Sequence, residues 1–316
     1  MPQNNGFVAK CFASRSPFWC NHFSFRNGGW LGGSRLPASY FNPWRNPDEK
    51  DPDVLPPQDT TAIVMTVDGE IFSIPSPIQT ALLIKKSGAS YSKDILNPAN
   101  KAAQYSTTFA KALNLGIFGA DLAYVTMYDQ SQDAIGYLNS AKRIADDLGV
   151  SGAFDASTID RFSKNLGNQD SMLVLVGVAY RSSDAYLKNN DRKDVSGLVL
   201  AGGWLESLYF ATDLFSKKQN EDLKRRIAEQ KSSLNSLIEL LNQYYSQAEY
   251  TEFIDNLKDL ATVYEAVEFK YTFVAPTTDA EKKMTTINGK TEIKITPEQI
   301  KAITEKVKAM RTQIVG

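Results

Sequence analysis

Histidine and cysteine are almost missing from this chain of 316 residues. The single histidine is His22, and the only two cysteines are Cys11 and Cys20. These three potential zinc ligands lack the paired Cys-x-x-Cys or His-x-x-x-His spacing that is typical of zinc sites. From residue 23 onward, the sequence excludes Ser-His-Asp triads, Cys-His dyads and histidine-based metal sites. We therefore expect a protein without a bound metal or cofactor.

Long apolar runs and an excess of charge of one sign are also absent. The longest apolar run, residues 172–180, is about half the length that a membrane-spanning helix needs, so we expect no transmembrane helix. The formal net charge is -1, which argues against a nucleic-acid partner. Hydrophobic residues make up 42% of the chain, a composition typical of a globular protein with a sizeable core.

Residues 1–45 differ from everything after them. They hold three of the four tryptophans, and all their charged residues are positive, but they lack the apolar segment of a signal peptide. Three interpretations stay open: a disordered leader, a mis-called start or reading frame, or an aromatic and basic binding segment. Residues 46–61 are acidic and rich in proline, which predicts a linker.

Residues 62–270 predict a helical domain that begins with a short β-hairpin. The hairpin is expected at 62–74, with Asp68-Gly69 at its turn. Ser76-Pro77-Ile78-Gln79 predicts the start of a first helix, which Ser87-Gly88 ends. Apolar spacing and end signals predict further helices at 100–112, 116–128, 131–148, 157–166, 169–189, 192–216, 220–245 and 248–269. The expected fold is mainly α, either a multi-helix bundle or stacked helical hairpins.

Residues 271–316 predict a β-hairpin followed by a C-terminal helix. Phe269–Val274 is strand-like, and Asn288-Gly289 favours a hairpin turn within 285–295. Thr296-Pro297-Glu298-Gln299 predicts the start of a helix that runs to about residue 313. These strands could pair with the 62–74 hairpin in one small sheet. Residues 281–316 carry more basic than acidic side chains. A solvated helix face explains this better than a membrane or partner contact does.

Glycines recur inside the predicted helices, namely Gly116, Gly119, Gly177, Gly202 and Gly203. None belongs to a phosphate-binding loop motif. A glycine inside a helix costs roughly 1 kcal/mol relative to alanine, and close packing of two helices is the usual compensation. We therefore interpret these glycines as positions where helices cross closely.

Acidic and aromatic side chains also recur in these apolar helices, and they form the candidate site: Asp121, Tyr124, Tyr180, Asp184, Glu206 and Tyr209. One interpretation is a polar pocket whose carboxylates perform acid–base catalysis on a glycan. The other is structural, because a buried acid needs a partner; Lys111 and Arg181 are available. Catalysis would require the carboxylates to converge on an open cleft, with at least one raised pKa. Scattered or ion-paired carboxylates would indicate a binding or structural protein, which we favour.

Three segments resemble a family of uncharacterised helical proteins from Bacteroidetes-type bacteria. They are SYSKDILNP (90–98), KALNLGIFGADLAYVTMYDQ (111–130) and DVSGLVLAGGWLESLYFATDL (194–214). The resemblance covers about residues 70–250. It implies a cell-envelope location, because members tend to begin with a lipoprotein or export signal, a pattern from which residues 1–45 depart. It implies no activity and no catalytic residues.

We therefore expect a non-catalytic binding or structural protein of the cell envelope. Two alternatives stay open. One is a carboxylate-based hydrolase that acts on a polar polymer such as a glycan. The other is a helical-repeat scaffold for protein partners, suggested by the similar helix–turn–helix patterns of 115–148 and 200–240.

Overall fold

The computed structural model describes most of the chain beyond the predicted linker. The described residues are 62–67, 70–75, 77–150, 156–165, 168–279, 284–286 and 288–316. The predicted leader, 1–45, and the predicted linker, 46–61, lie outside them. The chain divides into two units, 1–54 and 55–316, and every described residue belongs to the second.

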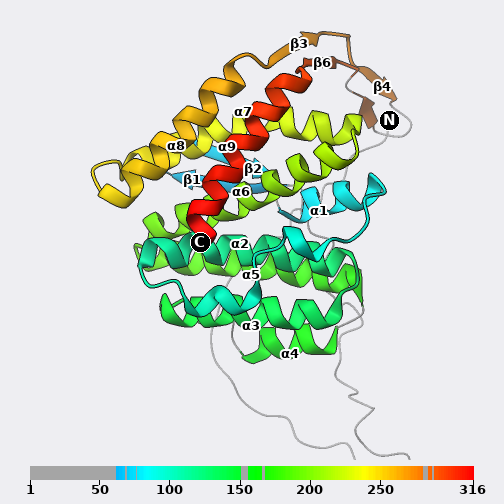
Figure 1. The fold of residues 1–316 in the computed structure, drawn as a ribbon. Helices are drawn as coiled ribbons and strands as arrows, with labels where there is room; N and C mark the ends of the chain where they lie inside the picture. The colour runs from blue at the N-terminus through cyan, green and yellow to red at the C-terminus, as the bar shows by residue number, and fades with distance from the viewer. Residues whose placement is uncertain are drawn as a thin grey trace, which may run out of the picture. The chain divides into compact units, whose positions relative to one another are not determined.

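The second unit is mainly α-helical, as predicted (Figure 1). Its long helices are α1 (Pro77–Lys86), α2 (Thr108–Met127), α3 (Ser131–Asp147), α4 (Ala156–Lys164), α5 (Gln169–Asn189), α6 (Lys193–Lys217), α7 (Glu221–Asn242), α8 (Ala248–Glu265) and α9 (Pro297–Val315). Two 3-10 helices, η1 (Lys93–Ile95) and η2 (Ala99–Ala103), lie between α1 and α2. Most helix bounds fall within a few residues of the predicted ones.

Helix α6 is the centre of the unit. Its residues are buried along almost the whole helix, and it packs against α1, α2, α5, α7 and α9. Figure 1 shows α2, α5 and α3 on one side of α6, and α7, α8 and α9 on the other. In a repeat array each unit contacts only its neighbours in the sequence. The contact of α6 with such distant helices makes this fold a bundle.

The predicted pair of helices at 100–112 and 116–128 is wrong. The structure has η2 and then one continuous helix, α2, which runs through Gly116. A Cβ atom on Gly116 would overlap the Val199 carbonyl oxygen in α6 and lie 2.6 Å from the Gly203 nitrogen. Gly116 therefore allows two helices to touch instead of ending one.

The same explanation holds for the glycine that faces it from α6. A Cβ atom on Gly202 would overlap the Leu113 carbonyl oxygen of α2. Gly177 in α5 differs, because a Cβ atom there would meet side chains and no backbone, namely Arg181 at 3.4 Å and Ile78 of α1 at 3.5 Å. Close contact with the backbone of another helix is therefore confirmed for Gly116 and Gly202, whereas Gly177 contacts another helix only through a side chain.

The strands form separate antiparallel pairs. β1 (Ala62–Val67) pairs with β2 (Glu70–Pro75), which confirms the predicted first hairpin. β3 (Glu268–Thr272) pairs with β6 (Lys290–Lys294), and β4 (Thr277–Asp279) pairs with β5 (Met284–Thr286). In the described part of the chain, the first hairpin does not join the later strands, so the predicted single sheet is wrong.

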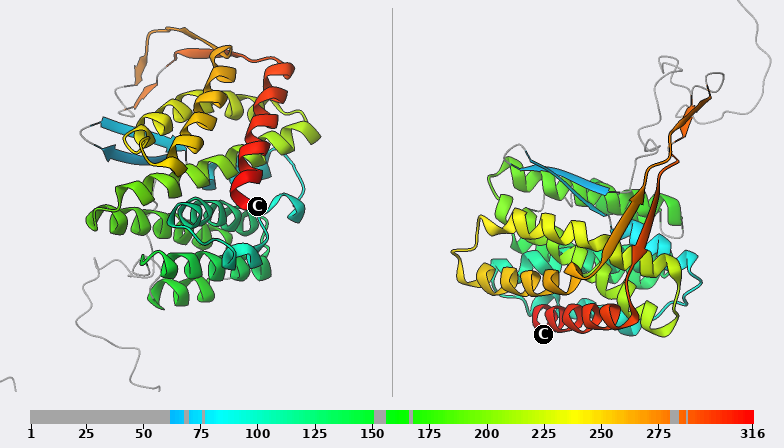
Figure 2. Two further views of the ribbon diagram at one scale, coloured as in Figure 1. Left: turned by 60° about the vertical axis from the view of Figure 1, so that its left-hand side comes forward. Right: turned by 90° about the horizontal axis from the view of Figure 1, so that it is seen from above.

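Asn288-Gly289 is not the turn of a hairpin, contrary to prediction. The strands that flank it, β5 and β6, pair with the earlier strands β4 and β3 instead of with each other. The Asn288 side chain donates hydrogen bonds across the ribbon to the Ala275 carbonyl (3.0 Å) and the Thr277 hydroxyl (2.8 Å). These long-range bonds and strand pairings outweigh the local turn preference. We call β3 to β6, with 273–276 and 288–289 between them, the β arm; it extends away from the helices (Figure 2).

Helix α9 follows the β arm and returns the chain to the bundle. Its predicted start is confirmed, because Thr296 and Gln299 form a reciprocal capping box and Pro297 occupies the first helical turn. The corresponding signal at Ser76 lies outside the described residues. The apolar face of α9 packs against α6 and α8.

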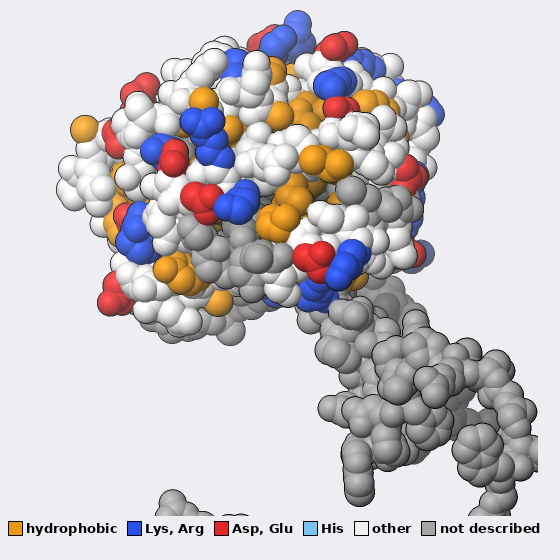
Figure 3. Space-filling view, turned by 90° about the horizontal axis from the view of Figure 1, so that it is seen from below, with side chains coloured by type: hydrophobic (Ala, Val, Ile, Leu, Met, Phe, Trp, Pro, Cys, Tyr) orange, Lys and Arg blue, Asp and Glu red, His pale blue; other side chains and the backbone are white. Residues whose placement is uncertain are grey.

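The described helices lack the length and apolar composition that would let any of them cross a membrane. The face drawn in Figure 3 carries interspersed acidic and basic side chains.

Candidate functional site

A buried ionic group lies where α2, α6 and α9 meet. Asp121 of α2 and Glu206 of α6 are each 0% exposed. Arg311 of α9 donates two hydrogen bonds to Glu206, from Nε to Oε2 (2.6 Å) and from Nη2 to Oε1 (2.7 Å). Its Nη2 also donates to the Ile95 carbonyl (2.9 Å). We call Asp121, Glu206 and Arg311 the carboxylate–arginine centre.

Tyr209 extends this centre by one contact. It lies one helical turn after Glu206 in α6. The guanidinium carbon of Arg311 is 4.2 Å from the centroid of the Tyr209 ring, a cation–π geometry. Arg311 is therefore held by a carboxylate and an aromatic face together. Three of the six candidate residues, Asp121, Glu206 and Tyr209, thus lie in one place.

Two of the other three candidate residues, Tyr124 and Asp184, have different partners in the described structure. The Tyr124 hydroxyl accepts a hydrogen bond from the Ser92 backbone N–H (3.1 Å), and its ring packs against Phe210. Asp184 of α5 pairs with Lys188 one turn later (2.6 Å). The side chain of Tyr180, also in α5, lies outside the described residues. Tyr124 and Asp184 therefore have local structural partners.

Arg311 is the residue that sequence reasoning missed. Lys111, one of the two partners considered for the buried acids, pairs instead with Asp147 at 3.3 Å. A signal for Arg311 was present, because Ile303, Val307 and Arg311 follow one another at four-residue spacing. Such spacing places all three on the same side of a helix, and Ile303 and Val307 are buried.

Two buried asparagines adjoin the centre and were also missed. The Asn97 side chain donates to Asn114 Oδ1 (3.2 Å) and to the Tyr105 hydroxyl (2.9 Å). Asn114 in turn donates to the Ile314 carbonyl in the last turn of α9 (3.1 Å). Both asparagines are 0% exposed. They join α2 to the end of α9 beside the Arg311 contact.

Burial dominates the electrostatics of the two acids. It raises the pKa of Asp121 well above its ordinary value, and the negative charge of Glu206 raises it further. Burial also raises the pKa of Glu206, but there Arg311 opposes the shift by charge attraction and hydrogen bonding. Because the Arg311 guanidinium contacts Glu206 directly, we infer that Glu206 ionises first and that Asp121 keeps its proton to higher pH.

The Asp121 carboxyl group lacks hydrogen-bond partners of good geometry within the described residues. The Asn97 backbone N–H and the Glu206 carboxyl lie near enough to influence its pKa. Within the described residues, however, neither Asp121 oxygen makes a hydrogen bond of standard geometry. An ionised carboxylate in this position would be strongly unfavourable, which agrees with a neutral Asp121.

We expect this neutral acid to give the protein a characteristic pH dependence. The pKa of Asp121 is higher in the folded state than its ordinary value of 3.8, so the native state binds the proton more tightly. The tighter proton binding by Asp121 in the folded state stabilises the protein fully below pH 3.8. This stabilisation is lost as the pH rises through the folded-state pKa of Asp121. Asp121→Asn cannot ionise, so the stability of this variant relative to wild type should increase over that window.

Urea unfolding at a series of pH values measures this difference. The gain should not exceed about 1.4 kcal/mol per pH unit, the limit for one proton. Asp184→Asn is the matched control, because Asp184 is a partly exposed carboxylate that is paired with Lys188. If wild type and Asp121→Asn kept a constant stability difference from pH 4 upward, a neutral buried Asp121 would be wrong.

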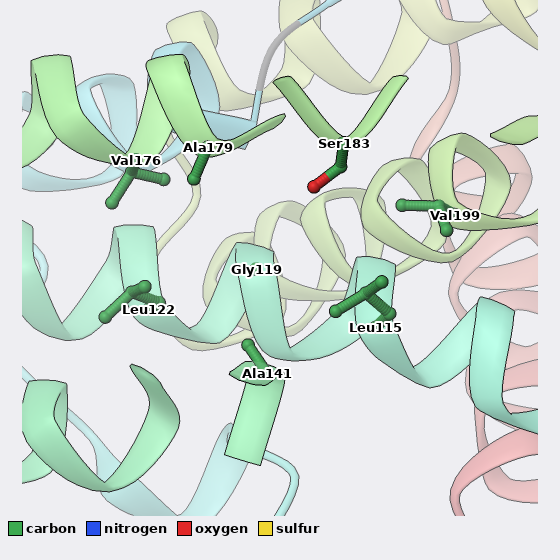
Figure 4. Close-up of a pocket in the computed structure, with 8 residues that line it drawn as sticks. All are labelled: Leu115, Gly119, Leu122, Ala141, Val176, Ala179, Ser183 and Val199. Carbon is green, nitrogen blue, oxygen red and sulfur yellow. The ribbon is translucent and has the colours of Figure 1, made fainter. Parts of the chain in front are cut away.

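Asp121 and Glu206 have no solvent-exposed surface at which a substrate could contact them. A cavity of about 20 Å³ lies between α2, α3, α5 and α6 (Figure 4), enough for about one water molecule. Its lining is mostly apolar and consists of Leu115, Gly119, Leu122, Ala141, Val176, Ala179, Ser183 and Val199. None of the candidate carboxylates lines it. This cavity cannot hold a glycan unit.

Within the described residues, no group of three or more histidine, cysteine, aspartate or glutamate side chains could hold a metal ion. Cys11, Cys20 and His22 lie outside those residues. Comparison of the chain with protein-family models, curated proteins and solved structures gives no match.

Proposed function

We propose that this chain is a non-catalytic binding or structural protein of the cell envelope. The observation that carries the non-catalytic part is the bidentate Arg311–Glu206 pair at a fully buried carboxylate. The envelope location rests on the sequence resemblance alone. The Glu206–Arg311 pair then serves to hold α9 against α6.

The arrangement of the acids supports this proposal over a hydrolase. A glycosidase needs two carboxyl groups on either side of an accessible bond, with room for a sugar and a water molecule. Asp121 and Glu206 have no exposed surface. Asp184 lies on a different helix, α5, where it is paired with Lys188. The raised pKa of Asp121 meets one criterion for a catalytic acid, but burial suffices to explain it.

We propose the β arm as the binding element. Five of its hydrophobic side chains are exposed: Phe269, Tyr271, Phe273, Val274 and Met284. Exposed aromatic residues of this kind often serve as anchors in protein interfaces. The helical body holds the base of the arm, because Lys231 of α7 donates to the Val267 carbonyl (2.8 Å) and Gln299 of α9 donates to the Ala266 carbonyl (3.0 Å).

Two assays test this proposal. Incubation of the purified chain with peptidoglycan and other polymeric glycans should release no reducing ends above the blank. Hydrolysis that disappears in Asp121→Asn would instead establish the hydrolase alternative.

In the second assay, the chain should sediment with isolated cell envelopes, and the double variant Tyr271→Ser/Phe273→Ser should lose most of that binding. Tyr186→Ser is the control, because Tyr186 is an exposed tyrosine (37%) in the helical body. Equal binding by all three proteins would rule out the arm as the binding element.

A further inference from the structure

Asn288 joins two parts of the β arm through its side chain. Its amide nitrogen donates to the Ala275 carbonyl (3.0 Å) and to the Thr277 hydroxyl (2.8 Å). The pairing of β3 with β6 stops at Thr272, and the pairing of β4 with β5 starts at Thr277. Both bonds of Asn288 therefore lie between the two strand pairs and help to keep the arm closed there.

The residue that follows Asn288 makes this side chain chemically labile. Gly289 has no Cβ atom, so little obstructs the approach of its backbone nitrogen to the side-chain carbonyl carbon of Asn288. Attack forms a bond between these two atoms and breaks the bond from Cγ to Nδ2. Ammonia leaves with the proton of the Gly289 amide, and a cyclic succinimide remains. Solvent water then opens the ring at either carbonyl, which yields aspartate or isoaspartate.

The β arm gives this reaction access. Asn288 and Gly289 are half-buried, and the arm extends away from the helices (Figure 2). In the closed arm, the Tyr271 ring lies against Gly289, where a Cβ atom would be 2.7 Å from ring carbons. A two-stranded ribbon is only marginally stable in water, so this segment opens more readily than the helices do. Opening frees both the Asn288 amide and the Gly289 nitrogen for the attack.

The product has the wrong hydrogen-bonding groups for this position. An amide nitrogen donates hydrogen bonds, whereas an ionised carboxylate only accepts them. The Ala275 carbonyl also only accepts, so its bond to residue 288 would be lost and two oxygen atoms would face each other. The Thr277 hydroxyl can turn and donate instead. Isoaspartate would in addition route the backbone through the side chain and shift the register of the ribbon.

We propose that Asn288 is a site of spontaneous deamidation and that the resulting acidic side chain loosens the β arm. The reaction consumes only water and needs no enzyme or cofactor. Asn288-Gly289 is the only Asn-Gly pair from residue 29 onward. This inference rests on the proposed role of the β arm as the binding element and supplies its regulation. As the chain ages, the loosened arm presents Tyr271 and Phe273 in a less ordered arrangement and binds less.

Peptide mapping by mass spectrometry tests the modification in the full chain, kept in mildly alkaline buffer and sampled over time. Asn288 should convert to aspartate and isoaspartate, whereas Asn242, an exposed asparagine that precedes a glutamine, should keep its amide. In Asn288→Gln the conversion should be lost, because the longer side chain has to form a larger ring. The Asn-Gly pair at 27–28 reports whether the conditions support the reaction. An Asn288 that still carries its amide when Asn27 has fully converted would overturn the inference.

Hydrogen exchange of the backbone amides tests the structural consequence. Asn288→Asp carries the aspartate product from the start, and Asn288→Gln is the matched control that keeps the amide donor. Exchange in β3 and β6 should be about 2- to 12-fold faster in Asn288→Asp, the factor that corresponds to one lost hydrogen bond. Exchange in α6 should be equal in wild type and both variants. Equal exchange of β3 and β6 in wild type and Asn288→Asp would overturn the loosening.

Envelope sedimentation separates this inference from the proposed function. Asn288→Asp should bind less than Asn288→Gln does. If Asn288→Asp bound as well as wild type while Tyr271→Ser/Phe273→Ser lost binding, the arm would remain the binding element and its regulation by deamidation would be wrong. If neither wild type nor Asn288→Gln bound, the proposed function would fall, whereas a modification and a loosening already measured by mass and by exchange would stand.

Discussion

Replacing Arg311 with methionine is expected to lower the free energy of unfolding by about 3–5 kcal/mol, the usual cost of removing one partner from a buried ion pair. The side chain of Arg311 is 12% exposed and that of Glu206 is fully buried. Without the guanidinium, Glu206 would lose two charge-assisted hydrogen bonds and Tyr209 its cation–π contact. Urea unfolding followed by circular dichroism measures the change.

Lys306→Met is the matched control for this variant. Lys306 lies on the same helix and pairs with Asp259 at 3.4 Å, but both side chains are exposed. Exposed ion pairs contribute about 0–1 kcal/mol, so this variant should unfold nearly like wild type. Equal stability of the Arg311 and Lys306 variants would show that α9 is held by its apolar face alone.

Replacing Gly116 with alanine is expected to destabilise the protein by about 1–3 kcal/mol or more, because the added methyl group overpacks a rigid contact. That group would overlap the Val199 carbonyl oxygen, and the backbone of α6 cannot move aside as a flexible side chain could. This loss of stability is opposite in sign to the gain of about 1 kcal/mol that alanine gives over glycine in an ordinary helix.

Gly136→Ala in α3 is the control for this effect of helix contact. A Cβ atom there would meet only the Ala99 side chain, at a comfortable 3.8 Å. This variant should therefore gain stability by up to about 1 kcal/mol. Thermal or urea unfolding of both variants measures the contrast, and two changes of the same sign would contradict the close crossing of α2 and α6.

The elements with local signals could be predicted from the sequence. The capping box of Thr296 and Gln299 and the paired strands around Asp68-Gly69 depend on residues that are neighbours in the chain. The continuity of α2 through Gly116 could not be predicted, because a glycine that breaks a helix and one that admits a second helix look alike in isolation. The decisive contact comes from Val199, far along the chain.

The strand order of the β arm shows the same limit. Asn288-Gly289 has the strongest local turn preference in that region, yet the pairing of Thr272 with Lys290 encloses it within a longer ribbon. A local preference of this kind gives way when more distant strands supply more hydrogen bonds. The alternation of Phe269 and Tyr271 with charged residues was visible in the sequence, but their exposure was not.

The candidate site was predictable in part. Asp121 and Glu206 stood out because an acid in an apolar helix must find a partner. That partner, Arg311, is 105 residues from Glu206 in the sequence, and the bundle topology alone brings the two together. Without that topology, Lys111 and Arg181 were equally reasonable partners.

We expect the buried Glu206–Arg311 pair to hold α9 on the bundle instead of acting on a substrate. A double-mutant cycle with Glu206→Gln and Arg311→Met tests it most directly, through the unfolding free energies of wild type, both single variants and the double variant. We expect a coupling energy of about 1.5 kcal/mol or more, as for other close charge pairs. A coupling energy near zero would contradict the claim, because Glu206 would then be free of Arg311 and available for another role.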